Sequence, residues 1–271
     1  MKRSTLKAAL LATVLAVGLP AIAQAHRSWM LPSATVLSGQ DVWVTIDAAV
    51  SNDLFYFEHQ PMRLNGLKVM APDGSEAKVE NASTGRYRST FDVRLTQEGT
   101  YKLAIAGDGL FARYKENGVQ KRWRGTAETL KEIPASATDL QLTQSQRRLE
   151  VFVTKGKPSD KVLQPTGAGL ELAPATHPNN LVAGEPARFQ LLIDGKPAAG
   201  IDVAVIPGGI RYRDRLNEMK IRTGEDGSFQ VAWPEPGMYW LNASYEDEKA
   251  SVSRASKRSA SYTATFEVLP E

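Results

Sequence analysis

The sequence predicts an all-β protein built from two tandem β-sandwich modules of the immunoglobulin-like or transthyretin-like type. Short segments rich in β-branched and aromatic residues alternate apolar and polar positions, and Gly, Pro, Asp or Asn bounds each of them. Long amphipathic helical patterns are absent, which favours antiparallel β over α/β. The expected strands are residues 42–46, 87–95, 100–106, 149–154, 189–193, 201–206, 229–233, 238–244 and 262–268.

A weak internal repeat divides the chain into the two modules. A short stretch ending in Ser-Gly-Gln or Ala-Gly-Glu, an Asp-Gly turn and a Gly-x-Tyr-x-Leu element occur twice in the same order. The tyrosines of the last element, Tyr101 and Tyr239, are expected to face inward together with the leucines two positions later. Module 1 is therefore placed at residues 26–155, a linker at 156–169 and module 2 at 170–271.

Module 1 carries a long insert at residues 107–148, between the strand of Tyr101 and its closing strand. The insert contains Phe111, Tyr114 and Trp123 beside a basic group at residues 121–124. Long loops inside compact domains are usually functional or disordered, and the aromatic residues argue against disorder. Two interpretations remain: a partner or ligand surface, or a projecting hairpin that packs Trp123 on its own sandwich.

The N-terminus has the three parts of a secretory signal peptide. Lys2, Arg3 and Lys7 form a basic start, residues 8–19 form an apolar run, and Ala23-Gln24-Ala25 is a small-residue cleavage site. The apolar run is shorter than the roughly 20 residues that cross a membrane. We therefore expect residues 1–25 to be removed, with a periplasmic or secreted mature protein that begins at His26 and has no membrane span.

Charge and cysteine content exclude several classes of function. The chain has 33 Lys and Arg residues against 30 Asp and Glu, and the three excess cations all lie in the expected signal peptide. The mature chain is therefore neutral, which gives no electrostatic reason to expect nucleic acid as a partner. Cysteine is absent, so thiolate metal sites and thiol catalysis are excluded. Hydrolase, phosphate-loop and dinucleotide motifs are also missing, and the prediction is a protein that is not an enzyme.

A transition-metal site is the chemistry that the histidines favour. Cleavage after Ala25 would give His26 a free α-amine beside its imidazole, and these two nitrogens can chelate one ion, with Cu(II) preferred over Ni(II), Co(II) and Zn(II). The further candidate ligands are His59, at the expected end of an aromatic strand, its neighbour Glu58, and His177 in a Pro-bounded loop of module 2. His26 and His59 could share an ion if their side chains lie within about 10 Å of one another.

Each candidate ligand also has a plain structural interpretation. His26 could be a frayed terminus, although the apolar residues 29–32 should anchor it. His59 could be a capping or half-buried residue, and His177 could be a surface residue. If His177 binds metal, its site should lie between the modules.

The mature N-terminus, Ala25-His26-Arg27-Ser28-Trp29-Met30-Leu31-Pro32-Ser33, resembles the start of a periplasmic family known as domain of unknown function 4198, described as nickel-uptake-associated or NikM-like. The likeness continues at residues 37–39, 118–125, 169–174, 192–197, 223–229 and 236–241. The resemblance implies an exported tandem β-sandwich associated with nickel or cobalt uptake, and it carries over His26 alone as a functional residue. Arg27 departs from the acidic residue expected after that histidine, and a cation beside a bound cation is unfavourable.

Three functional hypotheses follow. The first is a non-enzymatic metal-binding or metal-delivery protein that serves a membrane transporter or outer-membrane receptor, with His26, His59 and Glu58 as ligands. The second is a metal-free adaptor whose insert contacts a transporter, a cell-wall glycan or a periplasmic protein. The third is a copper oxygenase that pairs His26 with His59 or His177.

Overall fold

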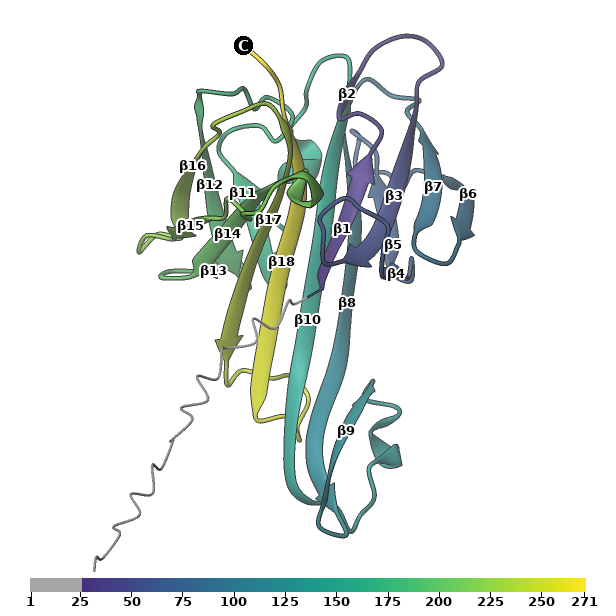
Figure 1. Ribbon diagram of the computed structural model, residues 1–271, viewed down its shortest axis with the longest axis vertical. Helices are drawn as coiled ribbons and strands as arrows, with labels where there is room; N and C mark the ends of the chain where they lie inside the picture. Colours follow the sequence, from purple (N-terminus) through teal and green to yellow (C-terminus); the bar gives the residue numbers. More distant parts are fainter. Residues whose placement is uncertain (1–25) are drawn as a thin grey trace, which may run out of the picture.

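The computed structural model describes residues 26–271, so the expected signal peptide lies outside the described residues. These residues form three β-sheets and three short 3-10 turns (Figure 1). The first outer sheet has the order β1-β3-β7-β6, with β4 added beside β3. Its strands are β1 (Arg27–Pro32), β3 (Trp43–Ser51), β4 (Gln60–Pro61), β6 (Val79–Thr84) and β7 (Ser89–Arg94).

The central sheet has nine strands and runs through the whole molecule. Its order is β15-β14-β17-β18-β10-β8-β5, with β2 beside β10 and β9 beside β8. The strands are β2 (Val36–Leu37), β5 (Leu67–Met70), β8 (Gly99–Glu116), β9 (Val119–Gly125), β10 (Thr138–Lys155), β14 (Asp202–Pro207), β15 (Met219–Arg222), β17 (Gly237–Asp247) and β18 (Lys257–Val268).

The second outer sheet is formed by four strands of the C-terminal half. They are β11 (Leu170–Pro174), β12 (Pro186–Ile193), β13 (Lys196–Pro197) and β16 (Ser228–Ala232). The turns are η1 (Leu130–Glu132), η2 (Lys161–Leu163) and η3 (Ile210–Tyr212). Within residues 26–271 no helix has the length and apolarity needed to cross a membrane.

The all-β prediction is confirmed, and each of the nine expected strand segments overlaps a strand. Nine of the strands in residues 26–271 lie outside the expected segments: β1, β2, β4, β5, β6, β9, β11, β13 and β15. Strand β6 is exposed along most of its length and β9 carries three cations in seven residues, so neither shows the apolar alternation by which strands are recognised.

Two separate cores confirm the two β-sandwiches. The first core lies between the first outer sheet and the central sheet, and the second lies between the central sheet and the second outer sheet. Strand β10 contributes Val151 and Val153 to the first core and Phe152, between them, to the second. Because successive side chains of a strand point to opposite faces, the two outer sheets cover opposite faces of the central sheet.

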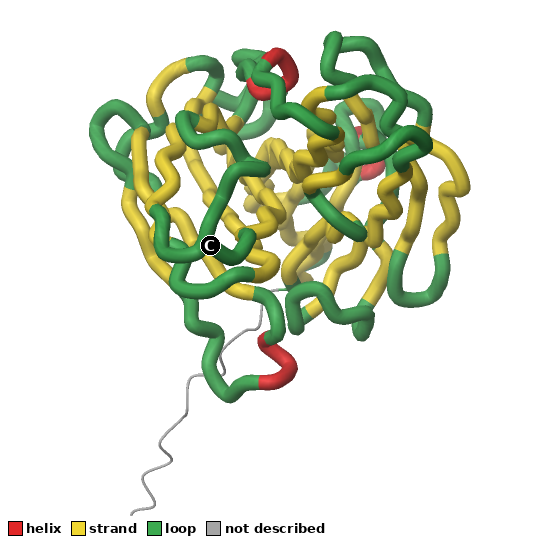
Figure 2. The backbone as a smooth tube through the Cα atoms, turned by 90° about the horizontal axis from the view of Figure 1, so that it is seen from above, coloured by secondary structure: helices red, strands yellow, loops and turns green. Residues whose placement is uncertain are grey.

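The two sandwiches share one sheet, which the sequence did not indicate. Strand β10 pairs in parallel with β18 from Thr143–Lys257 to Val151–Thr265, so the halves are joined by a backbone ladder, and the two strands lie side by side in Figure 1. Figure 2 gives the view from above, in which strands run through the middle of the molecule as well as around it. The expected linker, residues 156–169, is also part of this structure. Its turn η2 buries Val162 and Leu163 in the second core, and a single turn with two apolar residues is too short to show a period.

The internal repeat is visible in hydrogen bonds as well as in sequence. Tyr101 and Tyr239 are buried, as expected, and each hydroxyl donates to the backbone carbonyl four residues upstream, that of Gln97 and Glu235. This is the tyrosine-corner arrangement of immunoglobulin-like sandwiches. The Asp-Gly turns match equally well, because Asp73 and Asp226 each accept two hydrogen bonds from the serine two positions later.

The insert is an ordered arm rather than a loop. Strands β8 and β10 each run for 18 residues, well past the edge of the first sandwich, and β9 adds a third strand (Figure 1). A small core on one face holds the arm together, with Leu110, Ala112, Tyr114 and Leu142 buried and Trp123 packed against them. Trp123 therefore packs on the arm itself and not on the sandwich.

Candidate metal centre

The topology of the first outer sheet brings His26 and His59 to one place. Strand β1 pairs with one edge of β3 at Arg27–Ser51, and β4 pairs with the other edge at Gln60–Val50. Both neighbours are antiparallel to β3, so both begin beside its last residues. His26 precedes β1 and His59 precedes β4, and the two histidines therefore meet at the end of β3.

The two imidazole rings are stacked. Their centroids lie 3.8 Å apart and their planes are inclined by 15°. This separation is far inside the roughly 10 Å limit for sharing an ion. Both residues are exposed to solvent, so an ion could reach the nitrogens without opening the fold.

Trp29 anchors His26 to the body of the protein. Its side chain is fully buried, and its indole N–H donates to the Ser51 hydroxyl over 2.8 Å. Ser51 in turn donates to the carbonyl of Asp53, at the start of the segment that leads to His59. One hydrogen-bonded chain therefore links the strand of His26 to the loop of His59. From the sequence, Trp29 was expected only to be one of the apolar residues that anchor His26. No feature of the sequence predicted that Ser51 would be its hydrogen-bond partner.

The aromatic segment before His59 is a loop and not the expected strand. Phe55 has a positive φ of 62°, which an extended strand does not allow and which is costly for a bulky residue. The fold holds it there by packing, since Phe55 and Phe57 both contact Trp29, with ring centroids 5.5 and 5.6 Å away. Phe55 and Phe57 thus both pack on Trp29, although they do not lie on one face of a strand.

Glu58 supports this loop from within. Its Oε1 atom accepts hydrogen bonds from the backbone N–H groups of Asn52 and Asp53, at 2.8 and 3.0 Å. Across residues 26–271 there is no group of three or more His, Cys, Asp or Glu side chains that could hold a metal ion. The structure therefore does not place Glu58 as a third ligand beside the two histidines.

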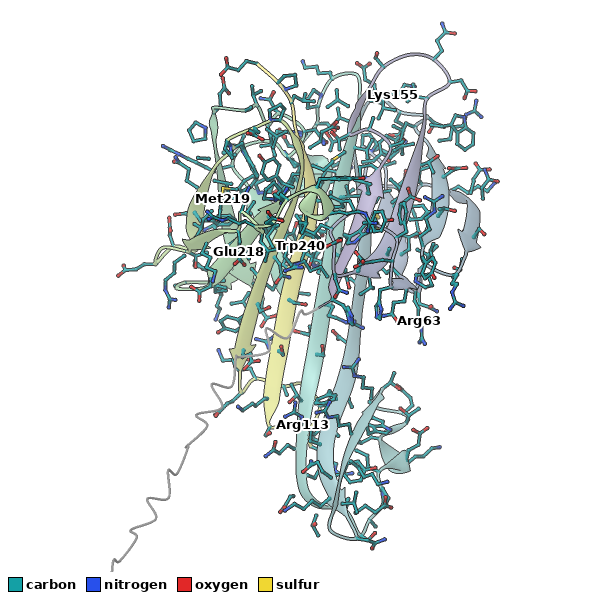
Figure 3. The ribbon with its side chains drawn as sticks, in the orientation of Figure 1. Arg63, Arg113, Lys155, Glu218, Met219 and Trp240 are labelled. Carbon is teal, nitrogen blue, oxygen red and sulfur yellow. The ribbon has the colours of Figure 1, made fainter. Side chains whose placement is uncertain are left out.

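Arg27 lies on the other side of β1 from the first core. Its Nη1 donates to the Asn52 carbonyl over 2.9 Å, and its guanidinium lies 5.9 Å from the ring centroid of Trp240. Trp240 sits where the two halves meet (Figure 3) and donates from its indole to the Ser28 carbonyl. Arg27 is thus held by a carbonyl and an aromatic face on the far side of β1 from the first core.

The side chains present at this position offer nitrogen donors of the kind that late transition-metal ions take. Two imidazoles supply two donors, and cleavage before His26 would add the α-amine as a third, in a chelate ring with the first imidazole. Parallel stacked rings direct their nitrogen lone pairs side by side. At least one ring must therefore rotate about its χ angles before both can bind the same ion, and solvent exposure leaves room for that rotation.

His177 lies at the opposite end of the first sandwich. Its Nε2 is 3.0 Å from the Thr100 hydroxyl and its Nδ1 accepts the N–H of Asn179. Thr100 is the second residue of β8, which begins shortly after β7 ends, and the last residue of β7, Arg94, pairs with the first residue of β3, Trp43. The nine residues of β3 separate that end from His26 by roughly 25 Å. His177 does lie between the two halves, but it cannot share an ion with His26.

His177 should make stability depend on pH. Burial lowers its pKa below 6.5, against the opposing effects of a Ser159 backbone group and the Asp160 carboxylate. A histidine whose folded pKa is depressed contributes stability above pH 6.5 that is lost as the pH falls below 6.5. Denaturant unfolding at pH 7.5 and 5.5 should show a smaller loss of stability in His177→Gln than in the unchanged protein. Equal losses of stability in the two proteins would show that His177 is not the source of the pH dependence.

Comparisons with solved structures yield distant superpositions. The D0-D1 domain of intimin aligns at 12% identity over 89% of this chain and 97% of that chain, with a TM-score of 0.23. Trypsin-activated alpha-2-macroglobulin from Escherichia coli aligns at 10% identity over 92% and 16%, with a TM-score of 0.22. The human OSCAR ligand-binding domain aligns at 10% identity over 90% and 100%, with a TM-score of 0.21. These scores are too low to support an argument about function.

The comparison with curated proteins gave no match. The profile of one family, described as a domain of unknown function (DUF4198), matches residues 23–247. The matched range includes both histidines of the stacked pair, the arm and most of the second sandwich. The chain therefore belongs to the DUF4198 family.

Proposed function

We propose that this chain is an exported, non-enzymatic protein that binds a divalent transition metal ion through His26 and His59. The observation that carries the proposal is the stacked pair, because two of the three histidines in the chain meet although 32 residues lie between them in sequence. After export and cleavage, the α-amine of His26 would complete a three-nitrogen donor set. Such a set suits Cu(II) or Ni(II) better than the harder cations.

Exposure of the pair favours delivery of the ion over permanent storage. A structural metal site is closed and buried, whereas here both rings face solvent. An ion held at such a site can exchange onto the ligands of a partner protein without local unfolding. We therefore propose a role as an accessory in transition-metal uptake, of the nickel or cobalt type, that passes the ion to a membrane transporter or outer-membrane receptor.

The contribution of His59 can be measured directly in protein that begins at His26. Replacement of His59 with alanine is expected to weaken Cu(II) and Ni(II) binding by at least about 100-fold, since losing even a supporting residue of a metal site commonly costs 10- to 100-fold. Isothermal titration with each ion gives the affinities.

His177→Gln is the matched control because it removes the remaining imidazole, far from the pair. It should leave the affinity unchanged. Equal affinity for His59→Ala and the unchanged protein would show that His59 is not a ligand and would refute a shared site.

A further inference from the structure

The arm carries a basic face on which Arg113, Arg122 and Arg124 are all exposed to solvent. On β9 and β8 the register places Arg122 opposite Arg113, and Arg124 opposite Phe111. The guanidinium groups of Arg113 and Arg124 lie 5.5 and 5.6 Å from the ring centroid of Phe111. Figure 3 shows Arg113 on the arm, away from the two sandwiches.

Within the described part of the chain, these three arginines have no counter-charge at ion-pair distance. No ion pair within residues 26–271 involves Arg113, Arg122 or Arg124, whereas the neighbouring Lys115 pairs with Asp139 at 2.8 Å. Like charges directly opposite each other on two strands destabilise a sheet. The arm therefore carries a repulsion that an external anionic group would relieve.

The turn at the tip fixes which backbone groups of β9 point outward. Asn117 and Gly118 both have positive φ, at 50° and 77°, as in a two-residue type I′ hairpin. Such a turn makes Glu116–Val119 a hydrogen-bonded pair, and hydrogen-bonded and non-hydrogen-bonded pairs then alternate along the ladder. Arg113–Arg122 is thus a non-hydrogen-bonded pair, the type with the closer side chains.

The same alternation leaves the free edge of β9 with unused hydrogen-bonding groups. Among residues 26–271, strand β9 pairs with β8 alone, and the N–H and C=O groups of Gln120, Arg122 and Arg124 point away from β8. The side chains of these residues lie on the basic face. At this edge, Arg122 and Arg124 therefore each present an outward-facing backbone N–H and C=O together with a guanidinium group that forms no ion pair within the described residues.

We infer that the edge of β9 binds an extended acidic segment of a partner protein, which adds a strand to the central sheet. A residue opposite Arg122 and another opposite Arg124 would be two positions apart on that segment, so carboxylates at alternate positions would meet both guanidinium groups. The small core behind the arm holds β9 in place before binding, which lowers the ordering cost.

Charge also argues against a second copy of this chain as the occupant. Antiparallel pairing of β9 with itself would bring arginines and Lys121 of one copy against those of the other, and like-charge pairs oppose it. Charged side chains on an edge strand protect it from pairing with a copy of itself. An occupant of this edge must therefore carry the opposite charge.

The test uses synthetic eight-residue peptides in which Glu alternates with Thr. The full chain should bind this peptide, and replacement of Glu by Lys should abolish binding. N-methylation of the backbone groups that face β9 should weaken binding by at least about tenfold, because a strand needs those hydrogen bonds. Fluorescence anisotropy of labelled peptides supplies the affinities.

Two variants separate the arginines from charge in general. The double variant Arg122→Glu with Arg124→Glu should no longer bind the Glu peptide and should bind the Lys peptide instead. Circular dichroism confirms that the variant is folded. Lys121→Glu is the matched control, since its side chain lies on the other face of β9, and it should bind like the unchanged protein.

Equal binding of the N-methylated and unmodified peptides would overturn the proposal. So would binding to phosphatidylglycerol vesicles without binding to the peptide, because the face would then recognise a lipid surface and not a strand. Neither result depends on metal, so failure here leaves the proposed function untouched.

Discussion

Replacing Trp29 with alanine is expected to lower the free energy of unfolding by about 3–5 kcal/mol, the usual cost of deleting a buried aromatic side chain. Trp29 is fully buried in the cluster that joins the two halves, with Ile206, Ile210 and Trp240 from the second half. The substitution would remove the contacts of Phe55 and Phe57 and the hydrogen bond to Ser51. Urea unfolding followed by circular dichroism measures the change.

The same substitution should also weaken metal binding, because Trp29 positions β1 against the loop of His59. Trp29→Phe serves as the control, since it keeps an aromatic ring and loses the indole N–H. We expect it to cost less stability and to retain most of the affinity. A Trp29→Ala protein that stays folded and binds Cu(II) as tightly as the unchanged protein would show that the anchor does not position His26.

Replacing Arg148 with methionine is expected to destabilise the protein by about 3–5 kcal/mol, as is typical when one member of a buried ionic group is removed. Arg148 lies 3.4 Å from both Glu150 and Glu171, whose side chains are each 4% exposed. Glu150 also accepts the hydroxyl of Tyr262 over 2.9 Å. Without the guanidinium, two buried carboxylates would face each other where β10, β11 and β18 meet.

The Arg148→Met effect should depend on pH in a defined direction. Burial alone would raise the pKa of Glu171, but hydrogen bonds from Thr166, the charge of Arg148 and a hydrogen bond from Gly167 lower it below 4.5. A carboxylate with a depressed folded pKa contributes stability at neutral pH that is lost as the pH falls through that pKa. The difference between variant and unchanged protein should therefore be larger at pH 7 than at pH 4. A constant difference would contradict this account.

The fold class could be predicted because alternation marks strands that have one buried face. Residues 42–46 and 229–233 follow the alternation closely, with every second residue buried, and overlap β3 and β16. The arm could not be recognised as two continued strands, since Gly107, Asp108 and Gly109 interrupt the apolar pattern where β8 leaves the sandwich. Nor could the shared sheet be predicted, because parallel pairing of β10 with β18 joins residues more than 100 positions apart.

The candidate site could be predicted in part. Chemistry alone identified His26, because a cleavage site gives a histidine its second donor. The meeting of His26 with His59 depends on β1 and β4 flanking β3 on opposite edges, and local sequence does not encode such pairing. Glu58 was selected for its charge beside His59, whereas the fold uses that carboxylate to hold the backbone of Asn52 and Asp53.

The most direct test of the central claim is a titration of Cu(II) and Ni(II) into two versions of the mature protein. Both begin at His26, but in one of them the α-amine is acetylated. If the α-amine and imidazole of His26 chelate the ion together with His59, acetylation removes the amine donor and with it the chelate ring, and the affinity should fall by at least about 100-fold. Equal affinity of the two versions would contradict an N-terminal histidine site.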